Sequence, residues 1–144
     1  MNISSTFHSP ETTADAEAIY RESKHPIYLS GGQEVVLRLQ HELEHISDLI
    51  DLSNIDELHG VHAEGSTLSI GAGENHAAIA VSAVVAQKVP VLSELASNIG
   101  DSQTRNRGTI GGAIASKTRS SDWNAALLAL EAMIHTTKTS HMAE

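Results

Sequence analysis

The sequence predicts an α+β fold, with a small α/β subdomain over residues 1–55 and a second α+β subdomain over residues 56–144. Three observations predict this fold class. Helical and strand-like segments alternate in the first part, a hairpin pattern follows, and apolar helical segments come after the hairpin. The length of 144 residues suits one compact domain, or a pair of small subdomains that share a core.

The first elements follow from capping residues, apolar spacing and glycine. Residues 12–22 begin with two threonines suited to capping and carry apolar residues at helical spacing, so we expect a helix. Residues 26–30 are short and apolar and end at Gly31-Gly32, which predicts a buried strand and a tight turn. We expect a short helix over residues 35–39 and a second strand over residues 48–52.

The second part begins with a predicted hairpin. Two short apolar segments, residues 61–63 and 68–70, flank Glu64-Gly65-Ser66, which is a turn signal. The remaining segments predict helices over residues 77–87, 90–98 and 123–131, a polar loop over residues 100–108, a small glycine-rich segment over residues 109–115, and the start of a strand over residues 132–135. Pro90 suits the first turn of its helix.

Composition excludes several functions. The net charge of -9 argues against nucleic acid or an anionic membrane surface as a partner. The chain has no cysteine, so it forms no disulfide and ligates no iron–sulfur cluster through cysteine. The first residues lack the pattern of a signal peptide, and the most apolar stretch, residues 77–86, is too short to span a bilayer. We therefore expect a cytoplasmic protein.

Two glycine pairs, Gly31-Gly32 and Gly111-Gly112, are candidate anion-binding turns. Glycine allows positive φ and a close approach of the backbone, and successive amides in such a turn can hold phosphate oxygens. Arg105, Arg107 and Thr109 precede the second pair and could assist. The same pairs also fit ordinary turns, and neither matches the dinucleotide fingerprint or the P-loop. The residues alone indicate a possible anion-binding domain.

A longer motif links the chain to a family. Residues 99–112, Ile-Gly-Asp-Ser-Gln-Thr-Arg-Asn-Arg-Gly-Thr-Ile-Gly-Gly, resemble the signature loop of FAD-binding subunits in the xanthine dehydrogenase and carbon monoxide dehydrogenase family. Residues 28–32, Tyr-Leu-Ser-Gly-Gly, resemble the first FAD loop of that family. Lesser motifs follow in the family's order, at residues 49–53, 68–72, 76–77, 122 and 125–130. The resemblance covers about residues 8–134 and implies a PCMH-type FAD-binding fold with FAD as cofactor.

The resemblance also implies site residues. One loop would wrap the FAD phosphates and ribityl chain with Tyr28, Leu29, Ser30, Gly31, Gly32, Gln33, Glu34 and Val35. A second wall would come from Thr109, Ile110, Gly111, Gly112 and Ala113. Asp122 is a candidate partner for the polyol region, and it also fits the N-cap of the helix that follows. Ala113 stands where the family usually has Asn, and Arg119 where it usually has Pro.

The resemblance implies partners rather than catalysis by this chain. In the family, a molybdenum-cofactor subunit oxidises the substrate, iron–sulfur clusters carry electrons to FAD, and the flavin passes them to an external acceptor. Clusters and molybdenum would belong to partner subunits, and we expect no catalytic acid or base here. Family members are longer, so the second subdomain is expected to be incomplete. A remnant that has lost the flavin and serves as a docking module is an alternative.

A third interpretation comes from His41-Glu42-Leu43-Glu44-His45. On a helix, His41 and His45 would share one face and could bind zinc, with Glu42 as general base of a hydrolase. No third ligand follows at a fixed spacing, and a polar connector explains the same residues. Our main prediction therefore assigns no metal site to the chain.

Overall fold

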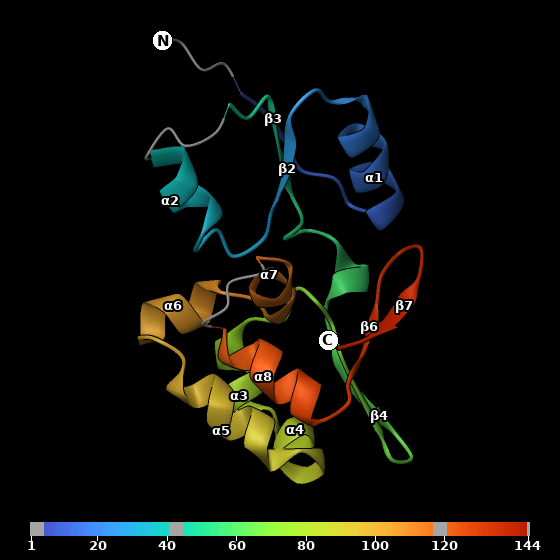
Figure 1. The fold of residues 1–144 in the computed structure, drawn as a ribbon, viewed down its shortest axis with the longest axis vertical. Helices are drawn as coiled ribbons and strands as arrows, with labels where there is room; N and C mark the ends of the chain where they lie inside the picture. The colour runs from blue at the N-terminus through green and yellow to red at the C-terminus, as the bar shows by residue number, and fades with distance from the viewer. Residues whose placement is uncertain (1–4, 41–44, 117–120, 144) are drawn as a thin grey trace.

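The computed structural model describes residues 5–40, 45–116 and 121–143, and it confirms the α+β class. The first part of the chain forms β1 (Thr6–His8), α1 (Thr13–Glu22), β2 (Pro26–Leu29), α2 (Val35–Gln40) and β3 (Asp48–Asp51). Its strands make a parallel sheet in the order β1-β3-β2. In Figure 1 this sheet stands between α1 and α2.

Helix α1 is placed by its cap and by one buried residue. The Thr12 hydroxyl accepts a hydrogen bond from the Asp15 amide at 3.1 Å, which pairs one of the free N–H groups in the first turn of the helix. Ala16 then packs with Ile50 of β3 and with Ile55, both of which are fully buried. The central strand of the sheet therefore has its apolar face covered, as parallel strands require.

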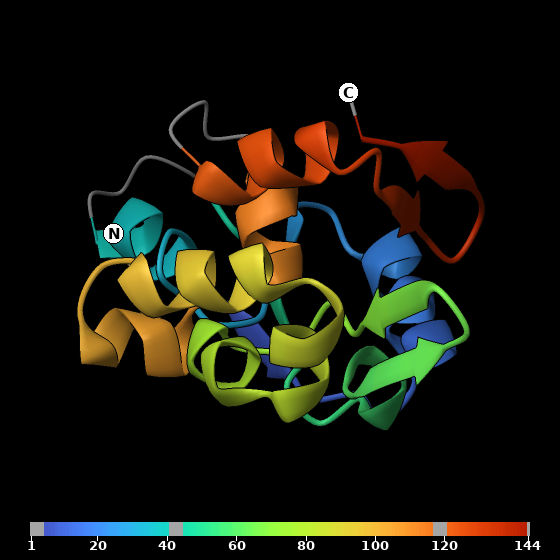
Figure 2. The same ribbon diagram turned by 90° about the horizontal axis from the view of Figure 1, so that it is seen from below.

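The second part is mainly helical. It contains the 3₁₀ helix η1 (Asp56–Leu58), the antiparallel hairpin of β4 (Val61–Glu64) and β5 (Thr67–Ile70), the helices α3 (His76–Val81), α4 (Ala83–Lys88), α5 (Pro90–Asn98), α6 (Ser102–Arg107), α7 (Ile110–Ala115) and α8 (Asp122–Ala129), and the hairpin of β6 (Met133–His135) and β7 (Ser140–Met142). In Figure 2, α5 lies between α8 on one side and α3 with α4 on the other.

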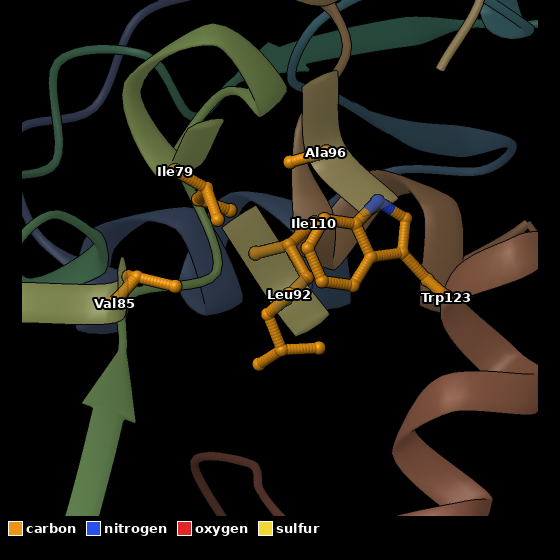
Figure 3. Packing of buried hydrophobic residues seen from close by; sticks show 6 residues of the cluster. All are labelled: Ile79, Val85, Leu92, Ala96, Ile110 and Trp123. Carbon is orange, nitrogen blue, oxygen red and sulfur yellow. The ribbon is translucent and has the colours of Figure 1, made fainter. Parts of the chain in front are cut away.

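A hydrophobic cluster holds these helices together. Its buried members are Ile79, Val85, Leu92, Ala96, Ile110 and Trp123, one or two from each of five helices (Figure 3). Trp123 is 1% exposed, and it is the largest of the fully buried side chains. Burying an indole of this size contributes several kcal/mol, so Trp123 fixes α8 against α3, α5 and α7.

Most predicted elements are confirmed, and two are wrong. Residues 77–87 do not form one helix, because Ser82 takes an extended conformation (ψ 117°) and its hydroxyl caps α4 through the Val85 amide. Residues 100–108 are not a loop, because Asp101 caps the polar helix α6 through the Thr104 amide at 2.7 Å. Strands β1 and β7 were not predicted, and both are only three residues long.

Strand β2 also differs from the prediction in its burial. Its residues are half-buried rather than buried, and Tyr28 is 37% exposed. The sheet has β2 at one edge, so this strand is covered on fewer sides than β3. The two hydrophobic clusters lie in the first and second parts of the chain, while the division at residues 55 and 56 stays a prediction.

Candidate cofactor-binding site

A cavity of about 560 Å³ lies where the end of β2 meets the helical part of the chain. Figure 1 shows α7 at this place, directly below the ends of β2 and β3. The wall is built by both predicted glycine loops together with residues of α1 and β2 and residues that flank the β4–β5 hairpin, such as Leu58, Ala72 and Gly73. Of the residues predicted from the sequence, the lining includes Tyr28, Ser30, Gly31, Gly32, Gln33, Glu34, Val35, Thr109, Gly111, Gly112 and Ala113.

The first glycine loop, residues 30–34, is held by very close backbone packing. A Cβ on Gly31 would lie 1.9 Å from the carbonyl oxygen of Arg107 and 2.9 Å from Cα of Gly108. Gly32 has a φ of 74°, a conformation that side chains with a Cβ rarely adopt. Each glycine is therefore required for a different reason, Gly31 for space and Gly32 for backbone conformation.

The first loop presents unpaired amides. Within the described residues, no acceptor pairs with the backbone N–H of Gly31, Gly32 or Gln33. All three residues line the cavity. Unpaired N–H groups are rare in folded chains unless water or a ligand accepts from them. Consecutive amides beside a residue with positive φ are the arrangement that binds anions in proteins, so this loop suits a phosphate group.

The second glycine loop uses its amides within the chain. The N–H of Ile110 donates to the Glu74 carbonyl at 3.0 Å, and that of Gly111 donates to the Ala72 carbonyl at 2.8 Å. The N–H of Gly112 donates to the Thr109 hydroxyl at 3.1 Å. The anion-binding mechanism expected for both glycine pairs is therefore available only to the first pair.

Gly111 serves packing instead. A Cβ there would lie 2.6 Å from the Ala72 carbonyl oxygen, so glycine lets α7 approach the loop after β5. The pair lies in the first turn of α7, which Thr109 caps, rather than after a strand. The assignment of residues 109–113 as the second wall for a ligand stays a prediction.

The two loops are joined by one side-chain hydrogen bond. The hydroxyls of Ser30 and Thr109 lie 3.0 Å apart, although the residues are 79 positions apart in the sequence. Thr109 is 7% exposed, and its hydroxyl also accepts from the Gly112 amide. This contact fixes the distance between the loops on either side of the cavity.

The described lining contains no lysine or arginine. Arg105 donates to the carbonyls of Ile99 and Gly100 at 3.0 and 2.9 Å, which satisfies the end of α5. Arg107 contributes its backbone against Gly31, and its side chain is exposed. Neither arginine is part of the described cavity wall, so the groups in that wall suited to an anion are the backbone amides.

Sequence reasoning missed two aromatic lining residues. Tyr20 stacks on Tyr28 with ring centroids 4.7 Å apart, and both rings line the cavity. Burial raises the pKa of the Tyr28 hydroxyl, with a smaller contribution from the nearby Glu17 carboxylate. His76 is the second, and the sequence indicated it only as part of a lesser family motif at residues 76–77. It is 5% exposed, and burial lowers the pKa of its imidazole.

Three predicted site residues lie outside the lining: Leu29, Ile110 and Asp122. Ile110 belongs to the hydrophobic core. Asp122 is exposed in the first turn of α8, and Ser121 occupies the N-cap position without a side-chain hydrogen bond, so the N-cap prediction for Asp122 is wrong.

The zinc motif is only partly visible. His41, Glu42 and Glu44 lie outside the described residues, as does Arg119, and His45 is exposed. Over residues 5–40, 45–116 and 121–143, no group of three potential metal ligands lies together.

The fold is of the α+β class, and its cavity is lined by two glycine loops, the first of which has unpaired amides among the described residues. The chain belongs to the family described as "FAD binding domain in molybdopterin dehydrogenase", whose family model matches residues 2–144. This confirms the resemblance seen in the sequence, and the cofactor of the family is FAD.

Similar proteins support the same assignment. The carbon monoxide dehydrogenase medium chain of Hydrogenophaga pseudoflava is 35% identical over 127 residues, which are 88% of this chain and 44% of the relative. The xanthine dehydrogenase FAD-binding subunit of Escherichia coli O157:H7 is 30% identical over 118 residues, 81% of this chain and 40% of the relative.

Solved structures match most of the chain. The carbon monoxide dehydrogenase structure from Hydrogenophaga pseudoflava that lacks the Mo-pyranopterin moiety aligns with a TM-score of 0.90 and 31% identity, covering 97% of this chain and 50% of that one. Quinoline 2-oxidoreductase from Pseudomonas putida 86 aligns with a TM-score of 0.92 and 25% identity, with the same coverage. The chain thus spans about half the length of these relatives. None of its described helices is long and apolar enough to cross a membrane.

Proposed function

We propose that the chain binds FAD in this cavity, with the pyrophosphate held by the amides of Gly31, Gly32 and Gln33. The observation that carries the proposal is the row of amides that have no partner within the described residues, in a cavity wall whose described part contains no lysine or arginine. A pyrophosphate supplies several acceptor oxygens, and hydrogen bonds to a charged acceptor are stronger than neutral ones. The family match supports FAD as the source of that group.

The residues fit such a ligand. The space beside Gly31 is already filled by the Arg107 carbonyl, so the loop is fixed before a ligand arrives. The Ser30–Thr109 hydrogen bond keeps the two loops at a set distance. When bound, FAD supplies the electron-transfer chemistry, while the chain binds, orients and shields it. No residue of the chain is assigned as a catalytic acid or base.

The proposed biological role is that of the flavin subunit of a molybdenum-containing hydroxylase or dehydrogenase. Relatives named as medium chains or FAD-binding subunits of carbon monoxide and xanthine dehydrogenases support this role. The partners would be a molybdenum-cofactor subunit and an iron–sulfur subunit, from which electrons pass through the flavin to an external acceptor. The absence of cysteine fits clusters carried by a partner. A division into subdomains at residues 55 and 56 and a cytoplasmic location are part of the proposal.

The alternative is a remnant that keeps the fold without the flavin. Ala113, which lines the cavity in place of the asparagine usual in the family, is the observation in its favour, because an alanine offers no side-chain hydrogen bond.

The test is a titration of the purified chain with FAD, followed by flavin fluorescence. We expect saturation near one FAD per chain and weaker binding of riboflavin, which has the same ring system without phosphates. Saturation with equal affinity for FAD and riboflavin would contradict the role of the amides. No binding by a folded sample would contradict the function and favour the remnant.

A further inference from the structure

His76 presents a single defined donor to the cavity. The residue begins α3, and its backbone N–H donates to the Gly108 carbonyl at 3.0 Å. The indole Nε1 of Trp123 lies 3.2 Å from Nδ1 of His76, and both rings are buried. An indole N–H can only donate, so Nδ1 must accept. In a neutral imidazole the proton then resides on Nε2.

The protonated nitrogen lies beside Gly108. A Cβ on Gly108 would lie 2.8 Å from Nε2 of His76, so a glycine is required for this close approach. Within the described residues, Nε2 has no hydrogen-bond partner. Every fully buried side-chain nitrogen or oxygen in this part of the chain does have a partner, so Nε2 is not fully buried. Nε2 therefore retains accessible surface, and His76 is part of the cavity lining.

From this geometry we infer that Nε2–H of His76 donates a hydrogen bond to an acceptor atom of the bound flavin nucleotide, and that Trp123 is the positioning residue that holds the required tautomer. The inference rests on the proposed function. The stacked arrangement of the two rings, with centroids 5.8 Å apart, limits rotation of the imidazole. Burial lowers the pKa of His76, which keeps the ring neutral at neutral pH.

Two variants of His76 separate its donor from its bulk. His76→Leu removes the donor and keeps an apolar side chain of similar size, so we expect FAD affinity to fall about tenfold, as for the loss of one net hydrogen bond of about 1.4 kcal/mol. His76→Gln keeps an N–H donor near the position of Nε2, so we expect it to recover part of the affinity. Thermal unfolding of each variant verifies that the tested chain is folded.

The tautomer is tested without FAD. In histidine-labelled chain, long-range 1H–15N spectra at neutral pH should show the proton of His76 on Nε2, and Trp123→Phe should give a mixture of tautomers. A proton on Nδ1 in the wild type would overturn the inference. Equal FAD affinity of folded wild type and His76→Leu would also overturn it. Failure of the wild type to bind FAD would instead refute the proposed function, and with it the ligand contact.

Discussion

Gly31→Ala is the substitution for which the structure makes the sharpest quantitative prediction. The new Cβ would lie 1.9 Å from the Arg107 carbonyl oxygen, whereas real Cβ contacts essentially never fall below 3.0 Å. Both chain segments are backbone, so they must separate by about 1 Å, a change that costs roughly 1–3 kcal/mol in well-packed sites. The same movement stretches the Ser30–Thr109 hydrogen bond, now 3.0 Å, which contributes about 1 kcal/mol.

We therefore expect Gly31→Ala to lower the free energy of unfolding by about 2–4 kcal/mol. FAD affinity should fall by at least about tenfold, because losing one charge-assisted hydrogen bond costs roughly 1.5–3 kcal/mol. Urea unfolding and FAD titration measure the two effects. In the control, Gly65→Ala, the new Cβ has no atom within 4 Å but the φ of 57° is strained, so stability falls by about 1 kcal/mol and FAD affinity stays constant. Unchanged stability and affinity in Gly31→Ala would refute the packing described for the loop.

Three further predictions concern single contacts. Tyr20→Ala removes the stack on Tyr28 and should lower the free energy of unfolding by about 0.5–1.5 kcal/mol, measured in urea against Tyr20→Phe, which keeps the stack. Asp101→Ala removes the cap of α6 and should cost about 1 kcal/mol, whereas Asp101→Asn should cost less; equal losses would contradict capping. Burial lowers the pKa of His76 from its ordinary 6.5, so the unfolded chain binds this proton at higher pH than the folded chain. The melting temperature should therefore fall as the pH drops below about 6.5, and less so in His76→Gln. The fold also lowers the pKa of the carboxyl groups of Glu17, Asp48 and Asp101. These groups change the stability only at lower pH, below 4.5. Equal acid sensitivity of both chains would contradict the burial of a neutral imidazole.

Local signals made much of the fold predictable. Helix α1 follows from the Thr12 cap, and the β4–β5 hairpin follows from a turn in which Gly65 takes a φ of 57°. The polar helix α6 was missed because its composition resembles a loop and its main signal is a single capping residue, Asp101. The break at Ser82 was missed because its neighbours continue an apolar pattern that suits one helix.

The site was predictable only at the level of residue types. The glycine pairs indicated close backbone approach, yet whether an amide is paired depends on tertiary neighbours, such as the Ala72 carbonyl that accepts from Gly111. The role of His76 was not visible because its partner, Trp123, lies 47 residues away in the sequence. Likewise the space beside Gly31 is filled by the backbone carbonyl of Arg107, and a backbone contact of this kind cannot be predicted from the pattern of side chains in the sequence.

The most direct test of the amide site is the 1H–15N spectrum of the labelled chain with and without FAD. We expect the largest downfield shifts of amide protons at Gly31, Gly32 and Gln33, whose N–H groups are unpaired in the described structure. Gly111, whose N–H already donates to Ala72, should shift much less. Large shifts at Gly111 with an unchanged first loop, at saturating FAD, would contradict the assignment of the pyrophosphate to the first loop.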